Sequence, residues 1–212
     1  MIHVCVPLYN RNEHIRKLMW NIEDIVNETE DYNVELHVYD FNSKGLLFEL
    51  EAERLNIQSH VIYDEPPFII GKALQRLGES IPCDDIIYFC DADTCLPKDI
   101  FKRIRSKTEK GKSFYCPIVS FEKADGRIWT PVNDHRGCGN IGIYSSDFKD
   151  SHGWLGTVFM TKTTWGGHDS HIRLRLESTL QANREIESDQ YTRYHSRDGG
   201  WYRRNTMYAW EK

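Results

Sequence analysis

Residues 85–97 read DIIYFCDADTCLP, a hydrophobic run followed by two aspartates one residue apart. The run 85–90 has the continuous apolar character of a strand buried inside a parallel sheet. Ligands of such sheets bind beyond the carboxyl ends of the strands, where Asp91 and Asp93 stand. Side chains alternate along a strand, so we expect both carboxylates to face one crevice and Ala92 to point away. The stretch therefore predicts a buried strand that ends at a candidate metal site.

Simpler roles for the two aspartates stay open at this point. They could be solvated in a loop, or one could cap a helix that starts near Pro97. A hard divalent cation, in contrast, prefers carboxylate oxygens and leaves coordination positions open for phosphate. The position directly after a buried strand favours the metal site over either alternative.

Strand and helix signals alternate through the first hundred residues. Strands are expected at 2–7, 34–39, 60–63 and 85–90, and helices at 12–27 (with Asn12 as N-cap), 46–55 and 69–80. Repeated β-α-β units predict an α/β fold with a mostly parallel central sheet and helices on both faces. The strand ends would then bring together Tyr9 to Arg11, Asp40, and Asp91 to Asp93.

The second half of the chain has weaker periodicity. A strand is expected at 113–121 and a helix at 171–183, and the tail 190–212 is aromatic and basic. Between them, residues 125–170 are rich in Gly, Trp, His and Asp, and long irregular segments of this kind are usually functional. With no linker and no internal repeat, residues 1–212 read as a single domain.

Composition narrows the classes of partner. The chain has 212 residues, a hydrophobic fraction of 40% and a net charge of -5, so it can build a core and has no overall attraction to nucleic acid. Neither a signal peptide nor a membrane span is expected. The six cysteines (5, 83, 90, 95, 116 and 138) contain no CxxC pair and are expected to be reduced thiols in the cytoplasm.

Two further clusters follow the aspartates. In TTWGGHDSH (163–171), the glycines allow close backbone approach, Trp165 offers an apolar face, and Asp169 could be a general base or merely a helix cap. In YHSRDGGW (194–201), His195 could be a metal ligand and Arg197 could meet a phosphate, or the segment could be a surface loop. Their combination is more specific than any one cluster.

Together these clusters resemble the nucleotide-sugar glycosyltransferases of the GT-A fold. VPLYNRNEHIRKLM (6–19), VYDFNS (38–43) and FCDAD resemble glycosyltransferase family 2. GNIGIYSSDFKDSHGW (139–154), WGGHD and YHSRD are similar to the galactosyltransferase and chondroitin-synthase branch. The resemblance implies a Rossmann-like domain with a nucleotide-binding half at about 1–93. An acceptor-binding half, with a metal-ligand tail, would follow at about 94–212.

The resemblance also implies roles for single residues. The donor nucleotide and its phosphates would meet Pro7, Tyr9, Arg11, Asp40, Lys72, Asp91 and Ala92. Mn²⁺ or Mg²⁺ would be held by Asp93 and His195, with Asp91 in support. Trp165, Gly166, Gly167 and His168 would shape the acceptor site, and Asp169 would be the catalytic base. His168 replaces the family's usual Glu, which puts one acceptor contact in doubt.

The implied activity is metal-dependent transfer of a sugar from a UDP-sugar to a glycan hydroxyl, with inversion, in polysaccharide biosynthesis. The alternatives are a retaining transferase, a non-catalytic carbohydrate-binding homologue and a nucleotidyltransferase; the last is disfavoured because VPLYNRNEH lacks a Gly-rich phosphate loop. The chain could be one domain of a longer enzyme. Because it lacks the anchor and stem of the Golgi members, a cytoplasmic enzyme of bacterial or viral type is expected.

Overall fold

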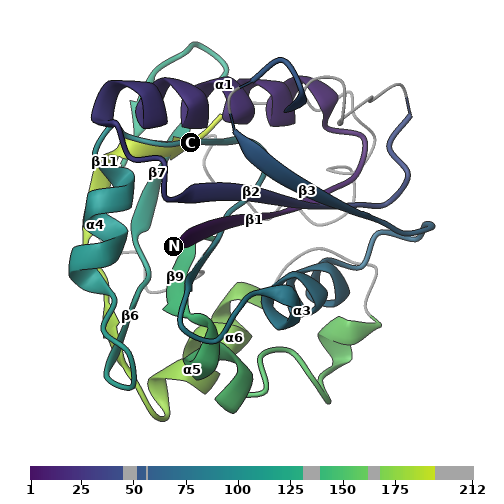
Figure 1. The fold of residues 1–212 in the computed structure, drawn as a ribbon, viewed down its shortest axis with the longest axis vertical. Coiled ribbons are helices and arrows are strands. Elements are labelled where there is room, and N and C mark those ends of the chain that lie inside the picture. Colours follow the sequence, from purple (N-terminus) through teal and green to yellow (C-terminus); the bar gives the residue numbers. More distant parts are fainter. Residues whose placement is uncertain (45–51, 56, 131–138, 162–167, 194–212) are drawn as a thin grey trace.

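The computed structural model describes residues 1–44, 52–55, 57–130, 139–161 and 168–193 (Figure 1). Its helices are α1 (Asn12–Thr29), α3 (Ile70–Ser80), α4 (Ile100–Lys107), α5 (Ser145–Asp150) and α6 (His168–Glu177), with a 3₁₀ turn η1 (Val158–Met160). The larger sheet contains β1 (Ile2–Leu8), β2 (Val34–Asp40), β3 (Gln58–Tyr63), β4 (Ile86–Phe89), β6 (Ser113–Tyr115), β9 (Ile141–Tyr144) and β10 (Gln181–Asn183). The smaller sheet contains β5 (Thr94–Cys95), β7 (Ile118–Glu122), β8 (Ile128–Trp129) and β11 (Ile186–Thr192).

The larger sheet has the strand order β10-β6-β9-β4-β1-β2-β3. β1 pairs in parallel with both β2 and β4, and β2 pairs in parallel with β3. Only β9 runs against its neighbours, β4 and β6. The predicted α/β fold with a mostly parallel central sheet is therefore confirmed.

Helices cover both faces of this sheet, as the alternating β-α units predict (Figure 1). Ile2, Val4, Val6 and Leu8 of β1 pack with the apolar stripe of α1 on one face. On the other face, strand residues such as Cys5 and Phe89 pack with α3, α5 and α6. The buried residues of both cores are at most 8% exposed, and their packing fixes the positions of the strand ends that carry polar residues.

The expected strand at 113–121 is wrong as a single element. Residues 113–115 form β6 in the larger sheet, and 118–122 form β7 in the smaller one. Between them stands Pro117, which has no backbone N–H to donate to a ladder. The chain therefore leaves one sheet there and enters the other.

The expected helix at 171–183 is wrong at both ends. α6 begins at His168 and ends at Glu177, and residues 181–183 form the edge strand β10 against β6. Pairing with β6 supplies hydrogen bonds that outweigh the local helical pattern. The weakly periodic segment also contains a central strand, β9, between β4 and β6.

Two local predictions concern the ends of helices. The N-cap position of α1 is Arg11 rather than Asn12, and Asn12 instead donates from Nδ2 to the carbonyl of Lys44 at 2.7 Å. The expected helix at 46–55 lies mostly outside the described residues. No helix in the described ranges combines the length and apolar character needed to cross a bilayer.

The expectation of six reduced cysteines is wrong at Cys116. Its sulfur is disulfide-bonded, and it accepts a hydrogen bond from Nη1 of Arg184 at 3.0 Å. Cys5, Cys83, Cys90 and Cys95 are free thiols. The spacing of the cysteines in the sequence did not reveal this disulfide, because the chain contains no CxxC pair.

Gly78 provides a test of the packing between α3 and α5. A Cβ at this position would lie 2.2 Å from Cε1 of Phe148, a fully buried ring that also contacts Phe89 and Trp154. Alanine normally stabilises a helix interior by about 1 kcal/mol relative to glycine. We expect Gly78→Ala to lower the free energy of unfolding by about 1–3 kcal/mol instead, because it overpacks the core.

Urea denaturation followed by circular dichroism measures this change. Arg76→Ala on the exposed side of the same helix is the control, and it should stay within about 0.5 kcal/mol of wild type. A gain in stability for Gly78→Ala would contradict the close packing of α3 against Phe148.

Candidate active site at the carboxyl edge of the sheet

Three βα loops meet at one edge of the larger sheet. β1 ends at Leu8, β2 at Asp40 and β4 at Phe89, and the parallel pairings place these ends side by side. Tyr9 to Arg11 and Asp91 to Asp93 directly follow two of these strands. The three strands run in parallel toward this edge, with Leu8 opposite Asp40 and Phe89 opposite Cys5. That the residues after them line one crevice stays a prediction, as do their roles.

The first two loops are braced against each other. Asn10, in the left-handed region with φ 52°, donates its backbone N–H to Oγ of Ser43 at 2.8 Å and accepts from Lys44 N at 3.1 Å. Ser43 in turn donates its backbone N–H and its hydroxyl to the carboxylate of Asp40. Asp40 is only 1% exposed, and its carboxylate accepts the hydrogen bonds that hold this loop in place.

Aromatic rings line the first loop. Tyr9 stacks on Phe68 with centroids 6.1 Å apart and planes at 13°, and Phe41 meets Phe68 edge-on at 5.2 Å. Such a group offers a flat apolar surface of the kind on which a base can stack. Sequence reasoning found Tyr9 but missed Phe68, whose only signal was its place after two prolines. Pro7 is buried within β1, and Arg11 is half-buried at the start of α1.

Lys72 on α3 lies at the neighbouring strand end. Its ammonium forms an ion pair with Asp64, which follows β3 and also accepts from the Tyr39 hydroxyl at 2.7 Å. The Lys72 hydrogen bond, with that of Tyr39, lowers the pKa of Asp64 to about 2. A ligand phosphate that reached Lys72 would therefore compete with a carboxylate that already holds it.

Asp91 and Asp93 stand in a tight turn rather than at the end of an extended strand. β4 ends at Phe89, and Thr94 N donates to the carbonyl of Asp91 at 3.1 Å, which closes the turn. Ala92 is buried in the core, while both aspartates are half-buried. The expectation that both carboxylates face one crevice stays a prediction, because the alternation of side chains along a strand does not apply in a turn. A ligand could meet Ala92 only through its backbone.

The carboxylates of Asp91 and Asp93 both affect the neighbouring Cys90. Burial, together with the charges of Asp91 and Asp93, raises the pKa of the Cys90 thiol well above its usual value. Half-buried carboxylate oxygens with negative potential are the donor set that a hard divalent cation prefers. The residues in place therefore fit Mn²⁺ or Mg²⁺, with Asp91 and Asp93 as the available ligands.

Asp169 lies beside this turn. Asp91 and Asp169 line one small cavity of about 10 Å³, together with Gly139, Trp154 and Leu74. Asp169 is in the first turn of α6, where the helix dipole favours a negative charge. The position of Asp169 is thus compatible both with helix capping and with general-base catalysis. The sequence did not reveal that Asp169 and Asp91 line one cavity.

Asn140 and Thr94 lie behind the turn. Both are buried, at 2% and 1% exposure, with Oγ1 of Thr94 and Oδ1 of Asn140 3.5 Å apart. A Cβ on the neighbouring Gly139 would sit 3.8 Å from Oδ2 of Asp91. Sequence reasoning quoted this Gly-Asn pair but assigned it no role, because only the antiparallel entry of β9 brings it beside the aspartates.

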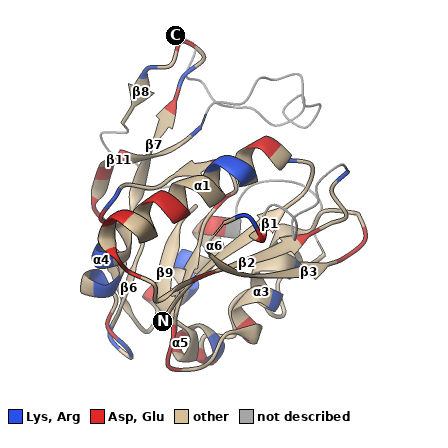
Figure 2. Ribbon diagram, turned by 45° about the horizontal axis from the view of Figure 1, so that its top comes forward, with Lys and Arg blue, Asp and Glu red and all other residues tan. Residues whose placement is uncertain are grey.

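The smaller sheet brings the end of the described chain to the same turn. β11 pairs antiparallel with β5, and Arg193 N donates to the carbonyl of Asp93 at 2.8 Å. An ion-pair network of Arg103 on α4 with Glu187 and Asp189, each at 2.6 Å, anchors β11. Figure 2 shows that α4 carries only basic charged residues, whereas α1 carries both acidic and basic ones.

Several predicted site residues cannot be placed. Trp165, Gly166, Gly167 and His195 lie outside the described residues. His168 is the first residue of α6, and its side chain is also outside the description. Their assignments stay predictions.

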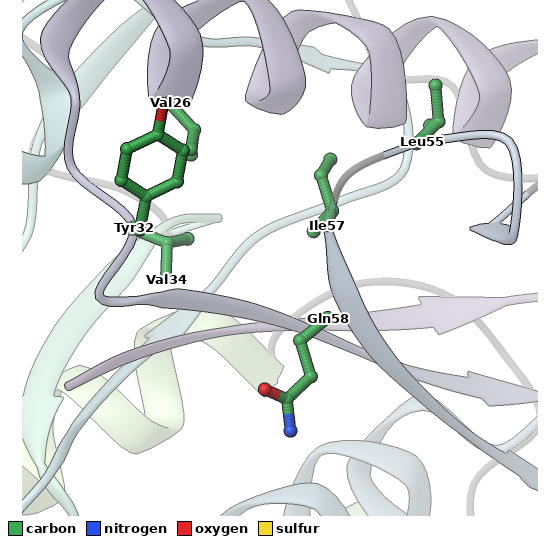
Figure 3. Close-up of a pocket in the computed structure, with 6 residues that line it drawn as sticks. All are labelled: Val26, Tyr32, Val34, Leu55, Ile57 and Gln58. Carbon is green, nitrogen blue, oxygen red and sulfur yellow. The ribbon is translucent and has the colours of Figure 1, made fainter.

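A larger cavity lies away from these carboxylates. It has a volume of about 370 Å³ and opens near the amino ends of β2 and β3, beneath α1 (Figure 3). Its lining residues are Val26, Tyr32, Val34, Leu55, Ile57 and Gln58. It offers no acid or base, so size alone does not make it the active site.

Comparison with known proteins assigns the family. A family model described as "Chondroitin N-acetylgalactosaminyltransferase" matches residues 1–205. Chondroitin sulfate N-acetylgalactosaminyltransferase 2 of Homo sapiens is 24% identical over 197 residues, which cover 81% of this chain and 35% of that protein. The Mus musculus protein of the same name is 23% identical with the same coverage. The chain thus spans about a third of the length of these relatives.

Solved structures give the fold. TarS 1–349 of S. aureus in complex with UDP-GlcNAc superimposes with a TM-score of 0.67 at 15% identity, over 92% of this chain and 59% of that one. The mannosyltransferase PcManGT of Pyrobaculum calidifontis, in complex with GDP-Man and Mn²⁺, gives 0.63 at 15% identity, over 94% and 58%. The predicted GT-A fold is confirmed by these likenesses.

The relatives also correct an expectation. The prediction of a cytoplasmic enzyme of bacterial or viral type is wrong, because the curated relatives are human and mouse proteins. The disulfide at Cys116 agrees with the correction, since disulfides persist mainly in oxidising compartments.

Proposed function

Because the chain belongs to the chondroitin N-acetylgalactosaminyltransferase family, we propose that it transfers a sugar from a UDP-sugar to a hydroxyl of a glycan. The names of its relatives favour N-acetylgalactosamine as the sugar and a chondroitin-type glycan as the acceptor. One observation carries the proposal: Asp91 of the DAD turn and Asp169 of α6, far apart in the chain, line one cavity at the carboxyl edge.

The donor would lie across the braced loops after β1 and β2. Tyr9, with Phe68 behind it, would support the uracil ring, and Pro7 and Asp40 would fix the loop that carries it. Arg11 and Lys72 would face the diphosphate, Lys72 by exchanging its Asp64 partner for a phosphate oxygen. Asp91 and the backbone of Ala92 would border the ribose.

A divalent cation would be held by Asp93 and His195, with Asp91 in support. The position of Arg193 favours this set, because its N–H is bonded to Asp93 and His195 follows only two residues later. When bound, Mn²⁺ or Mg²⁺ supplies positive charge against the negative charge that develops on the departing UDP.

Asp169 would act on the acceptor. Its carboxylate takes the proton from the acceptor hydroxyl as the oxygen forms a bond to the anomeric carbon. The bond from that carbon to the UDP oxygen breaks on the opposite face, so the anomeric configuration inverts. Trp165, Gly166, Gly167 and His168 precede Asp169 directly and would shape the acceptor side of the cavity.

A thermal-shift panel of nucleotide sugars tests the donor class. With Mn²⁺ present, UDP-GalNAc should raise the melting temperature, by mass action, more than GDP-mannose or UMP does, and a chelator should remove the difference. An equal response to every nucleotide, or one indifferent to the chelator, would contradict a metal-dependent UDP-sugar site.

A further inference from the structure

A polar cluster interrupts the apolar face of the sheet at its amino end. His3 of β1, Glu35 and His37 of β2, and His60 of β3 all point to the face that α3 and α5 cover further along, since His3 pairs with Glu35 and His37 with His60. His3 is 3% exposed and Glu35 is 9% exposed. The strands lie side by side in Figure 1. Buried groups of this kind need partners that account for every lone pair and proton.

Three side-chain atoms of this cluster converge on one point. Nδ1 of His3 lies 2.9 Å from Nε2 of His37, Nε2 of His37 lies 3.2 Å from Oε2 of Glu35, and Nδ1 of His3 lies 3.3 Å from the same oxygen. Ligands about 2.05 Å from a tetrahedral zinc ion are separated by about 3.3 Å. An ion about 1 Å above the plane of these three atoms would reach all of them at zinc distances.

The outer contacts suit metal ligation as well. Nε2 of His3 lies 3.1 Å from Oδ2 of Asp85, which is the carboxylate partner that orients a metal-bound imidazole and fixes its tautomer. When the proton of the His3 ring is on Nε2, the lone pair of Nδ1 faces the Glu35 carboxylate. A lone pair and a carboxylate repel each other, and a cation between them would make the contact favourable.

We propose that His3, Glu35 and His37 bind a transition-metal dication, with zinc the best fit, at the amino edge of the sheet. Two imidazole nitrogens and one carboxylate oxygen are ligands that zinc accepts, and water can fill the fourth position. The site joins β1 to β2. It lies about 17 Å from the carboxyl edge, five residues further along β1, so it is separate from the donor metal of the proposed reaction.

Cobalt spectroscopy of the whole chain tests the site without reference to transfer activity. Asp93→Ala is used as the background, so that the donor-side carboxylate does not contribute. Titration with Co²⁺ should give the intense visible absorption of a tetrahedral ion, saturating at one equivalent and displaced by equimolar Zn²⁺. His3→Gln and His37→Gln should each abolish it. The control is His152→Asn, which should leave this absorption unchanged. His152 is exposed, and asparagine tolerates its left-handed backbone conformation.

Two further measurements do not depend on those variants folding. Zn²⁺, but not Mg²⁺, should raise the melting temperature of the Asp93→Ala chain, which keeps all three proposed zinc ligands. Asp85→Asn should weaken Zn²⁺ binding by about 10- to 100-fold. The proposal would be wrong if the Asp93→Ala chain gave no saturable tetrahedral spectrum, or if that spectrum persisted in both histidine variants. The cluster would then be a hydrogen-bonded network with a shared proton. Failure of the donor panel with success here would overturn the proposed function and leave the zinc site standing.

Discussion

Asp93→Ala is expected to abolish metal-dependent donor binding and to lower kcat/KM by about 10³-fold, a loss of about 4 kcal/mol in transition-state stabilisation. Asp93 lies within the turn that follows β4, and its backbone carbonyl accepts a hydrogen bond from Arg193 N at 2.8 Å, which holds its backbone at the carboxyl edge. Removing its carboxylate takes away the proposed direct metal ligand while the turn hydrogen bonds stay. Titration calorimetry of UDP with and without Mn²⁺ measures the binding, and a UDP-release assay measures the rate.

The control for this variant is Asp24→Ala on the exposed side of α1, which removes the same charge far from the edge. It should keep the wild-type affinity and the wild-type response to Mn²⁺. His195→Ala should behave like Asp93→Ala. If both of these variants bound UDP with unchanged affinity and unchanged metal dependence, the assignment of Asp93 and His195 as ligands would be wrong.

Asp169→Asn is expected to separate binding from chemistry. The variant keeps the shape of the side chain that lines the cavity with Asp91, but an amide cannot accept the acceptor proton. General-base catalysis contributes about 10²–10⁴-fold, so kcat should fall by that range while the dissociation constant for UDP stays within a factor of about two. Steady-state kinetics and calorimetry on the same preparation make the comparison.

Asp150→Asn, an exposed acid at the end of α5, is the matched control and should leave both quantities unchanged. A helix-capping role for Asp169 predicts a different pattern. Asparagine caps helices about as well as aspartate, so the variant would then keep normal turnover. Normal turnover in Asp169→Asn would remove this residue as the base.

The first half of the fold was predictable because β1, β2 and β4 are almost wholly buried, although the edge strand β3 is largely exposed. Runs such as residues 2–7 and 85–90 are mostly apolar, with His3 and Asp85 as the exceptions, and one helix with a clear apolar stripe follows the first of them. Local sequence therefore carries the parallel βαβ pattern. The second half depends on distant pairing: Pro117 splits one apolar run between two sheets, and residues 181–183 become a strand only because β6 offers an edge.

The candidate site was predictable where chemistry is concentrated in short motifs. Asp91, Asp93 and Asp169 stand in strand-end or helix-start contexts that mark them, and the shared cavity of Asp91 and Asp169 agrees with the grouping. Phe68 and Asn140 were not predictable, because their places beside Tyr9 and Thr94 follow from the tertiary fold. The cluster of His3, Glu35 and His37 was missed for the same reason, since only the β1–β2 register aligns its members.

The most direct test of the proposed transfer is UDP release from UDP-GalNAc by the unmutated chain with a chondroitin oligosaccharide and Mn²⁺. We expect release that requires both the acceptor and the metal, with a glycan product one sugar longer whose new linkage has the anomeric configuration opposite to that of the donor. Release that ignored the acceptor or survived a chelator, or a product that retained the donor configuration, would contradict the metal-dependent inverting transfer proposed for this chain.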